Sequence, residues 1–134
     1  MPQLLIHTYE EHTDDQKRAL VKDLTETVCR AADVKPINVE VVFLKLNRND
    51  RAICGKLMSD VQDLSALSDD EIPWLIVQFQ LFEGRSLAQK RLLAKGVTED
   101  IAKHFAMNAG RIQIIFSEMN RMHNAIGGLL AVDR

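Results

Sequence analysis

The sequence predicts an α/β (α+β) fold in which two β-α-β units form one four-stranded sheet with two helices on one face. The main observation is an internal repeat, because a shift of 73 positions lays residues 2–17 (PQLLIHTYEEHTDDQK) over residues 75–90 (LIVQFQLFEGRSLAQK). The second observation is that short apolar runs alternate with amphipathic helical patterns inside each repeat. A tandem duplication therefore organises the whole chain.

The register of the repeat holds without a gap almost to the end of each half. Matching pairs include Gln16-Lys17 with Gln89-Lys90, Thr25-Glu26 with Thr98-Glu99, Asn47-Arg48 with Asn120-Arg121, Ala52-Ile53 with Ala125-Ile126, and Gly55 with Gly128. Each half has roughly sixty residues and would be marginally stable alone, so the halves should pack on each other. We therefore predict one domain over residues 1–134, with repeats at about 2–57 and 75–130 and an acidic connector at about 58–74.

The first repeat begins with a short apolar run, residues 4–9, that predicts a strand. Thr13 followed by Gln16 forms a capping box, which predicts a helix that Lys35-Pro36 ends. Its apolar stripe contains Leu20, Leu24, Val28 and Ala32, with Val21 beside them. Residues 39–46 alternate and predict a second strand, parallel to the first because a helix connects the two. The turn formers of residues 47–55 predict a loop or small hairpin.

The second repeat follows the same order. Residues 75–82 predict a third strand, and Ser86 with Gln89 forms a second capping box. The helical stripe that follows contains Leu93, Val97, Ile101 and Phe105, and Asn108-Ala109-Gly110 is expected to stop the helix. Gly96 lies inside that helix at a cost of about 1 kcal/mol relative to alanine, so we expect a packing reason for it. Residues 111–117 predict the fourth strand, and residues 120–128 repeat the hairpin.

Composition narrows the classes of function. The net charge is −2 and the charges are interspersed, which gives no reason to expect a nucleic-acid or membrane partner. The two cysteines, Cys29 and Cys54, have no metal-ligand or disulfide-framework spacing, and the histidines show no metal spacing either. No apolar run approaches the length of a membrane span. We expect a cytoplasmic protein with reduced thiols, and an oligomer, because one sheet face would otherwise stay bare.

The residues around both repeats resemble the 4-oxalocrotonate tautomerase family over the whole chain. The second repeat carries QFQLFEGRS, Glu118-Met119 and Ile126-Gly127-Gly128, while the first carries Pro2 directly after the initiator methionine. The chain looks like a fused member of the tautomerase superfamily, in which two repeats replace two short subunits. The resemblance implies the tautomerase fold, a homotrimer in place of a hexamer, a small carboxylate substrate, no cofactor and no metal.

The resemblance also implies roles for two residues. Removal of Met1 would make Pro2 a secondary amine, and such an amine titrates closer to neutrality than lysine does. Apolar surroundings and a nearby arginine would lower its pKa further, toward the pH at which a general base works best. Arg85 stands at the family's motif arginine and is expected to hold the substrate carboxylate or 2-oxo group, within its own chain or from a neighbour. Leu75 matches Pro2 in the second repeat, so each chain is expected to have one proline-centred site.

Several positions depart from the family pattern. The family's second arginine falls on Glu40 and Gln113, the motif arginine of the first repeat is His12, and the hairpin phenylalanine falls on Arg51 and Asn124. The substrate-binding candidates that could replace the missing groups are Arg51, Arg111 and His12.

Three functions remain open at this point. The first is an isomerase that interconverts enol and keto forms of a 2-hydroxy- or 2-oxo-carboxylate. The second is a dehalogenase or hydratase/decarboxylase of the cis-3-chloroacrylate dehalogenase type, with protonated Pro2 as the acid and Glu40 as a carboxylate that activates water. The third is a catalytically silent trimeric scaffold.

Overall fold

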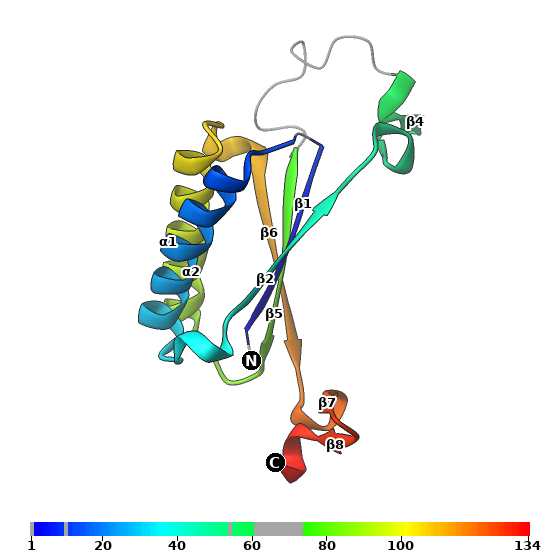
Figure 1. Cartoon of the computed structure of the whole chain (residues 1–134). Helices are drawn as coiled ribbons and strands as arrows, with labels where there is room; N and C mark the ends of the chain where they lie inside the picture. Colours follow the sequence, from blue (N-terminus) through cyan, green and yellow to red (C-terminus); the bar gives the residue numbers. More distant parts are fainter. Residues whose placement is uncertain (1, 10, 54, 61–73) are drawn as a thin grey trace.

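The computed structural model describes residues 2–9, 11–53, 55–60 and 74–134, so most of the connector predicted at 58–74 lies outside the described residues. The helices and strands are β1 (Gln3–Thr8), α1 (Asp14–Ala32), β2 (Glu40–Lys45), β3 (Ala52–Ile53), β4 (Lys56–Leu57), β5 (Leu75–Phe82), α2 (Leu87–His104), β6 (Ile112–Met119), β7 (Ala125–Ile126) and β8 (Leu129–Leu130). Figure 1 shows that α1 and α2 lie together on one side of the sheet. The predicted fold class and the repeated β-α-β order are confirmed.

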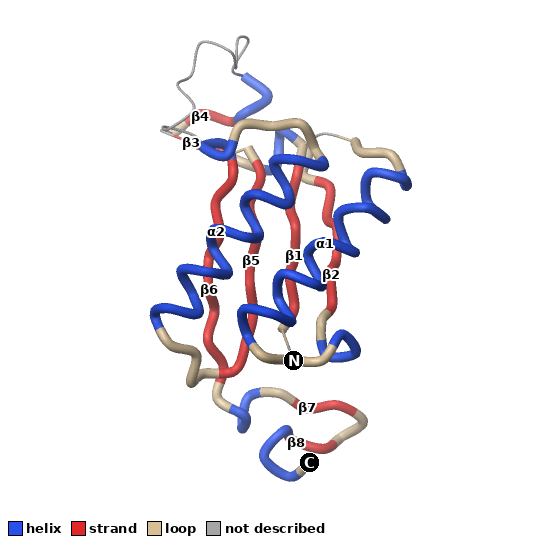
Figure 2. Tube along the Cα trace, turned by 90° about the vertical axis from the view of Figure 1, so that its left-hand side faces the viewer, coloured by secondary structure: helices blue, strands red, loops and turns tan. Residues whose placement is uncertain are grey.

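One mixed sheet carries the four long strands in the order β2-β1-β5-β6 (Figure 2). Within each repeat the two strands are parallel, as the crossover helix requires, and Gln3 is registered with Glu40 in the first repeat. The repeats meet through the antiparallel pair β1 and β5, in which Gln3 is registered with Gln80. This pairing places the start of β1 beside the end of β5.

Both helices begin where the capping boxes predict and end earlier than expected. The Thr13 and Ser86 side chains accept hydrogen bonds from the backbone amide of the third residue of each helix. The side chains of those third residues, Gln16 and Gln89, in turn accept hydrogen bonds from the Thr13 and Ser86 amides. α1 ends at Ala32, where Asp33 takes a left-handed conformation, rather than at Lys35-Pro36. α2 ends at His104, so the stop predicted at Asn108 is wrong; the Asn108 side chain instead caps a 3-10 turn.

The core lies between the helices and the sheet face that they cover. Each strand contributes alternate residues, because successive side chains point to opposite faces. The fully buried members are Leu4, Ile6, Leu20, Leu24, Val28, Leu75, Val77, Phe79, Leu81, Leu93, Val97 and Ile101. Both predicted helical stripes are therefore core.

Gly96 has the packing reason that its position predicted. A Cβ atom at this position would lie 2.5 Å from Cγ2 of Thr27 on α1. Thr27 is itself buried, and its hydroxyl is 2.6 Å from an Asp100 carboxylate oxygen. The two helices therefore approach closely at this glycine.

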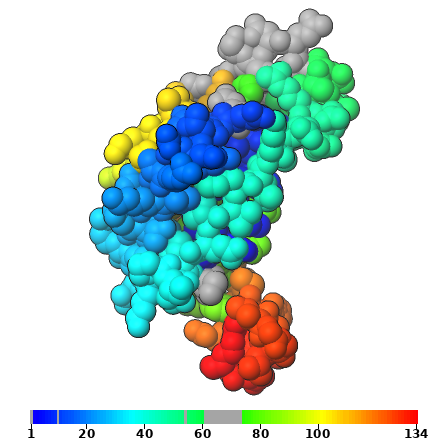
Figure 3. Space-filling view, in the orientation of Figure 1, coloured from blue at the N-terminus to red at the C-terminus, as the bar shows by residue number. Residues whose placement is uncertain are grey.

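The opposite sheet face has no cover among the described residues. Leu44 on β2 is 38% exposed and Ile115 on β6 is 44% exposed, while His7 and Gln78 are hydrogen-bonded at 2.9 Å in the middle of this face. The hairpins β3-β4 and β7-β8 project at opposite ends of the molecule, as Figures 1 and 3 show. Large apolar side chains of the β7-β8 hairpin, including Ile126 and Leu129, are more than half exposed.

Candidate active site

Pro2 lies at the junction of three strands. It is buried, and its carbonyl oxygen accepts a hydrogen bond from the Glu40 amide at 3.0 Å, which ties it to the start of β2. The antiparallel register of β1 and β5 brings it to the end of β5, next to the turn that leads into α2. The position of Pro2 is thus fixed by its own bond to β2 and by the pairing of the next residue, Gln3, with β5.

A cavity of about 340 Å³ opens at this end of the sheet. It is lined by Pro2, Val34, Asn38, Phe82, Glu83, Arg85, Arg121, Ile126, Ala131 and Arg134. The residues come from both repeats, and both chain ends lie at this end of the molecule (Figure 1). The structure therefore brings Pro2 and Arg85 of the same chain to one cavity.

The turn between β5 and α2 presents Arg85. Gly84 has φ = 112°, a conformation that a side chain would strain, and Ser86 begins the capping box immediately after Arg85. The Nε atom of Arg85 is buried and has no hydrogen-bond partner among the described residues. An unpaired buried donor is costly, and an oxygen of an anionic ligand would satisfy this one.

A second arginine reaches the same cavity from the end of β6. The Glu83 amide donates to the Met119 carbonyl at 3.0 Å, and Asn120 Nδ2 donates to Glu83 Oε1 at 2.9 Å. The Arg121 guanidinium carbon then lies 4.8 Å from the centre of the Phe82 ring, within cation-π range. Phe82, Glu83 and Arg121 all line the cavity.

The cavity lining carries an excess of positive charge. The lining residues include three arginines, Arg85, Arg121 and Arg134, and one acidic side chain, Glu83, whose Oε1 accepts the hydrogen bond from Asn120 Nδ2. Arg134 Nη2 donates to Asn124 Oδ1 at 2.8 Å. The arrangement suits a small anionic ligand beside Pro2.

The other three sequence candidates lie at the opposite end of their own chain. Arg51 sits over the Tyr9 ring at 5.7 Å, and Arg111 sits over the Trp74 ring at 5.1 Å. His12 stacks on Phe105 with ring centroids 3.6 Å apart. Pro2 lies beside the first residue of β1, whereas these three side chains lie at the end of the sheet where β1 finishes. A single chain therefore does not bring them to the Pro2 cavity.

That opposite end is the counterpart of the Pro2 cavity in the repeat, and aromatic side chains occupy it. Leu75 takes the place of Pro2, and Trp74 before it meets Tyr9 edge to face with ring centroids 6.1 Å apart. Leu75 is fully buried. The two ends of the fold have therefore diverged in chemistry.

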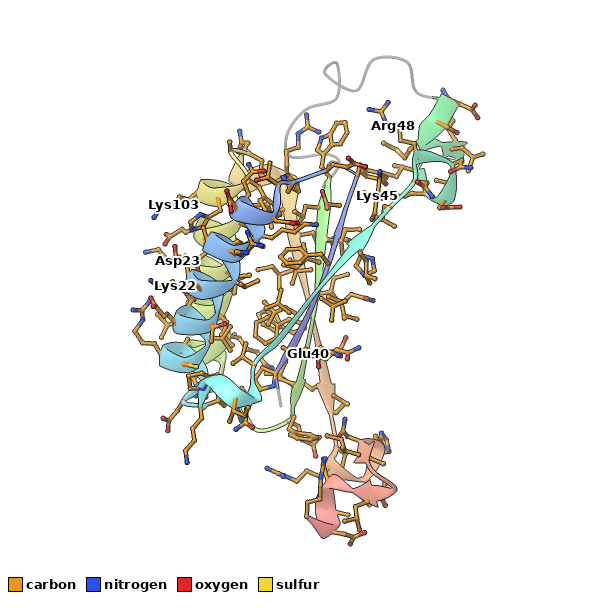
Figure 4. All side chains as sticks on the ribbon, in the orientation of Figure 1. Lys22, Asp23, Glu40, Lys45, Arg48 and Lys103 are labelled. Atoms are coloured by element: carbon orange, nitrogen blue, oxygen red, sulfur yellow. The ribbon has the colours of Figure 1, made fainter. Side chains whose placement is uncertain are left out.

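Glu40 lies on a different surface from the cavity. Its carboxylate accepts a hydrogen bond from Gln3 Nε2 at 3.2 Å, and it is absent from the cavity lining. Figure 4 shows the Glu40 side chain on the sheet face opposite the helices. Within one chain its carboxylate does not face the space beside Pro2.

Sequence reasoning missed Arg121 and Arg134 as cavity residues. The signal for Arg121 was present, because Asn120-Arg121 repeats Asn47-Arg48 at the start of a hairpin. What was lacking was the strand order, since the parallel register of Phe82 with Met119 delivers Arg121 to the turn after β5.

Neither a metal site nor a membrane span is found in the described part of the chain. No cluster of three or more His, Cys, Asp or Glu side chains there could hold a metal ion. Neither helix in the same ranges is long and apolar enough to cross a membrane.

Comparison with known proteins gives a consistent result for both repeats. The family model described as Tautomerase enzyme matches residues 2–60 and again 76–134. A probable tautomerase of Listeria monocytogenes serotype 4b is 34% identical over 61 residues, which cover 46% of this chain and all of the relative. A 2-hydroxymuconate tautomerase of Pseudomonas putida is 31% identical over 62 residues, covering 46% of this chain and 98% of the relative.

Solved structures share the complete fold. The asymmetric trimer of the fused 4-OT F6 aligns with a TM-score of 0.77 at 22% identity, over 97% of this chain and 96% of that one. A member of the cis-3-chloroacrylic acid dehalogenase family, N1, aligns with a TM-score of 0.73 at 16% identity, over 96% of this chain and 82% of that one. At these identities the structural matches show the fold alone.

Proposed function

The chain belongs to the tautomerase family, and on this premise we propose that it interconverts the enol and keto forms of a 2-hydroxy- or 2-oxo-carboxylate, with Pro2 as general base and acid. The observation that carries the proposal is that Pro2 and Arg85 line one cavity, where the buried Nε atom of Arg85 has no partner among the described residues. The proposal takes Pro2 as the amino-terminal residue after removal of Met1.

The surroundings of Pro2 favour its neutral form. A terminal α-amine titrates at about 7.7 to 8.0 in model peptides, already nearer neutrality than lysine. In a chain that lacks Met1, the burial of Pro2 and the arginines of the cavity lining would both disfavour a positive charge on the amine. A neutral secondary amine is the form that removes a proton.

The proposed reaction moves one proton and needs no external oxidant or reductant. Pro2 takes the proton of the 2-hydroxyl group, the enol electrons shift to form the 2-oxo group, and the ammonium returns the proton to a distant carbon. Arg85 binds the carboxylate or the 2-oxygen, on which negative charge develops as the proton leaves. The same two residues serve the reverse direction by microscopic reversibility.

Each chain has one such site in this proposal. Leu75 has an amide nitrogen without basicity in the place of Pro2, and Trp74 and Tyr9 occupy the space beside it. A trimer would then contain three proline-centred sites.

We further propose a homotrimer located in the cytoplasm. The uncovered sheet face and the exposed apolar residues of the β7-β8 hairpin both need a partner, and the fused 4-OT neighbours include trimers. In such an assembly Arg51, Arg111 and His12 could contribute to a Pro2 cavity only from a neighbouring chain. A cytoplasmic location agrees with the free thiol of Cys29.

The second candidate function is dehalogenation or hydration of an acrylate-type substrate; N1, a member of the cis-3-chloroacrylic acid dehalogenase family, shares the fold. It requires a carboxylate that activates water beside Pro2. Glu40 is the residue we proposed for that task, but within one chain its side chain bonds Gln3 on the other sheet face. Release of halide or of acetaldehyde from haloacrylates would distinguish this function from tautomerisation.

The deciding experiment follows the ultraviolet decay of phenylenolpyruvate and 2-hydroxymuconate with the wild type and with Pro2→Ala, on protein whose intact mass shows that Met1 is absent. We expect catalysis by the wild type and at least a hundredfold loss in the variant. Equal catalysis by both proteins would refute the role of Pro2. No catalysis by the mass-verified wild type would favour the haloacrylate activity or the silent scaffold.

A further inference from the structure

We propose that Arg121 is a second substrate-binding residue of the Pro2 cavity and that it determines specificity by holding the end of the substrate remote from the reacting carbon. The inference rests on the proposed tautomerase function and adds a residue and a selectivity to it. It starts from the charges of the cavity. Arg85 and Arg121 each line the cavity, and neither forms a salt bridge with a described residue.

The backbone holds Arg121 at the cavity through the pairing of β5 with β6. Phe82 is registered with Met119, the last residues of the two strands, and the bond from the Glu83 amide to the Met119 carbonyl extends this pairing by one step. Asn120 Nδ2 then bonds Glu83 Oε1, so the residue before Arg121 is tied to the residue after Phe82. Arg121 therefore starts from a fixed point on the cavity wall.

The side chain is oriented by the Phe82 ring. A guanidinium 4.8 Å from a ring centroid gains cation-π attraction over its face, while the N–H groups around its edge stay available for a carboxylate or carbonyl oxygen. Glu83 is the acidic side chain of the cavity lining, and one of its two carboxylate oxygens already accepts the hydrogen bond from Asn120. This pre-organisation lowers the entropy cost of binding an anion.

The other repeat supplies an internal comparison. Asn47-Arg48 occupies the corresponding sequence positions, but Asn47 Nδ2 bonds Asp50 within its own turn at 3.3 Å. Tyr9, the counterpart of Phe82, meets Arg51 instead. Figure 4 shows Arg48 at the end of the sheet remote from Glu40, and therefore remote from Pro2, whose carbonyl bonds the Glu40 amide. Only the Arg121 copy lines the cavity that contains Pro2.

Burial separates the tasks of the two arginines. Arg85 follows the strand that pairs with β1 and has a buried Nε atom, whereas Arg121 is exposed and begins the projecting hairpin. In the proposal Arg85 binds the oxygen groups next to the reacting carbon, and Arg121 binds a group farther along the substrate. A substrate with a carboxylate at both ends would use both residues, while a substrate with an apolar remote end would use Arg85 alone.

The test compares 2-hydroxymuconate, which has a carboxylate at each end, with phenylenolpyruvate, whose remote end is a phenyl ring. For Arg121→Ala we expect kcat/KM for 2-hydroxymuconate to fall ten- to a hundredfold, mainly through KM, and kcat/KM for phenylenolpyruvate to change less than threefold. Arg121→Lys should recover part of the loss, because it keeps the charge without the planar fork. Phe82→Leu should act in the same direction as Arg121→Ala and more weakly.

The matched control is Arg48→Ala, which removes the repeat counterpart and should leave both substrates unaffected. An equal loss on the two substrates, or no loss on either, would overturn the assignment of Arg121. If the wild type turns over phenylenolpyruvate alone, inhibition of that reaction by the non-reacting dicarboxylate muconate replaces the measurement with 2-hydroxymuconate. We expect muconate to inhibit Arg121→Ala at least tenfold more weakly than the wild type. Equal inhibition of the two proteins, or no inhibition of either, overturns the inference. Pro2→Ala keeps the two proposals distinguishable, since an active Pro2→Ala variant refutes the proposed function whatever Arg121 does.

Discussion

Thr27 donates a hydrogen bond to Asp100 at 2.6 Å, and the two residues occupy the same position in the two repeats. A residue can meet its own counterpart only beside an axis that exchanges the two halves. The sheet shows the same relationship, because Leu5 is registered with its counterpart Gln78. The approximate two-fold axis therefore passes through the helix pair and the centre of the sheet, and the Pro2 cavity and the Trp74 end lie on opposite sides of it.

The close approach at this axis predicts that Gly96→Ala destabilises the protein. A methyl group would lie 2.5 Å from Thr27 Cγ2, and Thr27 cannot rotate freely because it is β-branched and bonded to Asp100. Overpacking of a core costs about 1–3 kcal/mol, against the roughly 1 kcal/mol that alanine gains in helix propensity. Urea unfolding should therefore show a net loss of up to about 2 kcal/mol.

The matched control for Gly96→Ala is the same change in a Thr27→Ser background. Serine keeps the hydroxyl that bonds Asp100 and removes the methyl group that causes the clash. Gly96→Ala should therefore cost much less stability in the Thr27→Ser background than in the wild-type background. A Gly96→Ala protein that is more stable than the wild type would refute the packing explanation.

Much of the fold could be predicted from the sequence because its signals are local. The two capping boxes at Thr13 and Ser86 place both helix starts correctly, and the buried stripes follow the helical period. The helix ends were less predictable, since Asp33 and Ala106 terminate helices in a left-handed conformation that neither residue type signals strongly.

The candidate site was predictable only in part, because it depends on strand order. The motif places Arg85 after a strand and the resemblance singles out Pro2, but no spacing in the sequence says that β1 pairs with β5 rather than at another edge. The sequence indicates a hairpin position for Arg51 and a strand-face position for Arg111, but not the end of the sheet at which each lies. Arg121 was overlooked for the same reason.

Asp100 predicts a pH dependence of stability at the helix interface. Burial raises the pKa of its carboxyl above the ordinary value, the Thr27 hydrogen bond and the nearby His104 and Arg30 oppose the shift, and the Asp23 charge adds to it. For a raised pKa the native state favours the protonated form, so this contribution to stability is complete below the unfolded pKa of about 3.9 and is lost as the pH rises through the folded value.

Asp100→Asn should therefore be more stable than the wild type at neutral pH, by no more than about 1 kcal/mol. An amide imitates the protonated carboxyl at every pH and can still accept the Thr27 hydrogen bond. The difference between the two proteins should shrink as the pH falls toward 4, when the wild-type carboxyl gains its proton. Thermal unfolding from pH 3.5 to 8 measures this, and a difference that stays constant over the range would contradict it.

Arg85 predicts a graded loss of activity that separates charge from geometry. Arg85→Lys keeps a positive charge but loses the planar fork and the Nε donor, so kcat/KM should fall about tenfold; Arg85→Ala removes both and should cost roughly a hundredfold. Steady-state decay of either enol substrate measures this. Arg91→Ala, an exposed position on α2, is the control and should remain fully active. Equal activity of Arg85→Ala and wild type would remove Arg85 from the site.

The uncovered sheet face predicts that one charged substitution on it removes both trimer assembly and activity. Ile115 is 44% exposed on β6, so a partner that covers this face would bury it, and Ile115→Glu would then place a charge in an apolar interface at a cost of several kcal/mol.

Analytical ultracentrifugation should show a mass of three chains for the wild type and of one chain for the variant. Turnover should fall more than tenfold, because the β7-β8 hairpin that follows Arg121, with Ile126 and Leu129 exposed in the single chain, would lose its partner in the proposed trimer. Leu92→Glu, at an exposed position on the helix side, controls for added charge and should keep both the mass and the activity. A wild type that sediments as one chain, or an Ile115→Glu variant that remains a trimer, would show that this face is not the interface.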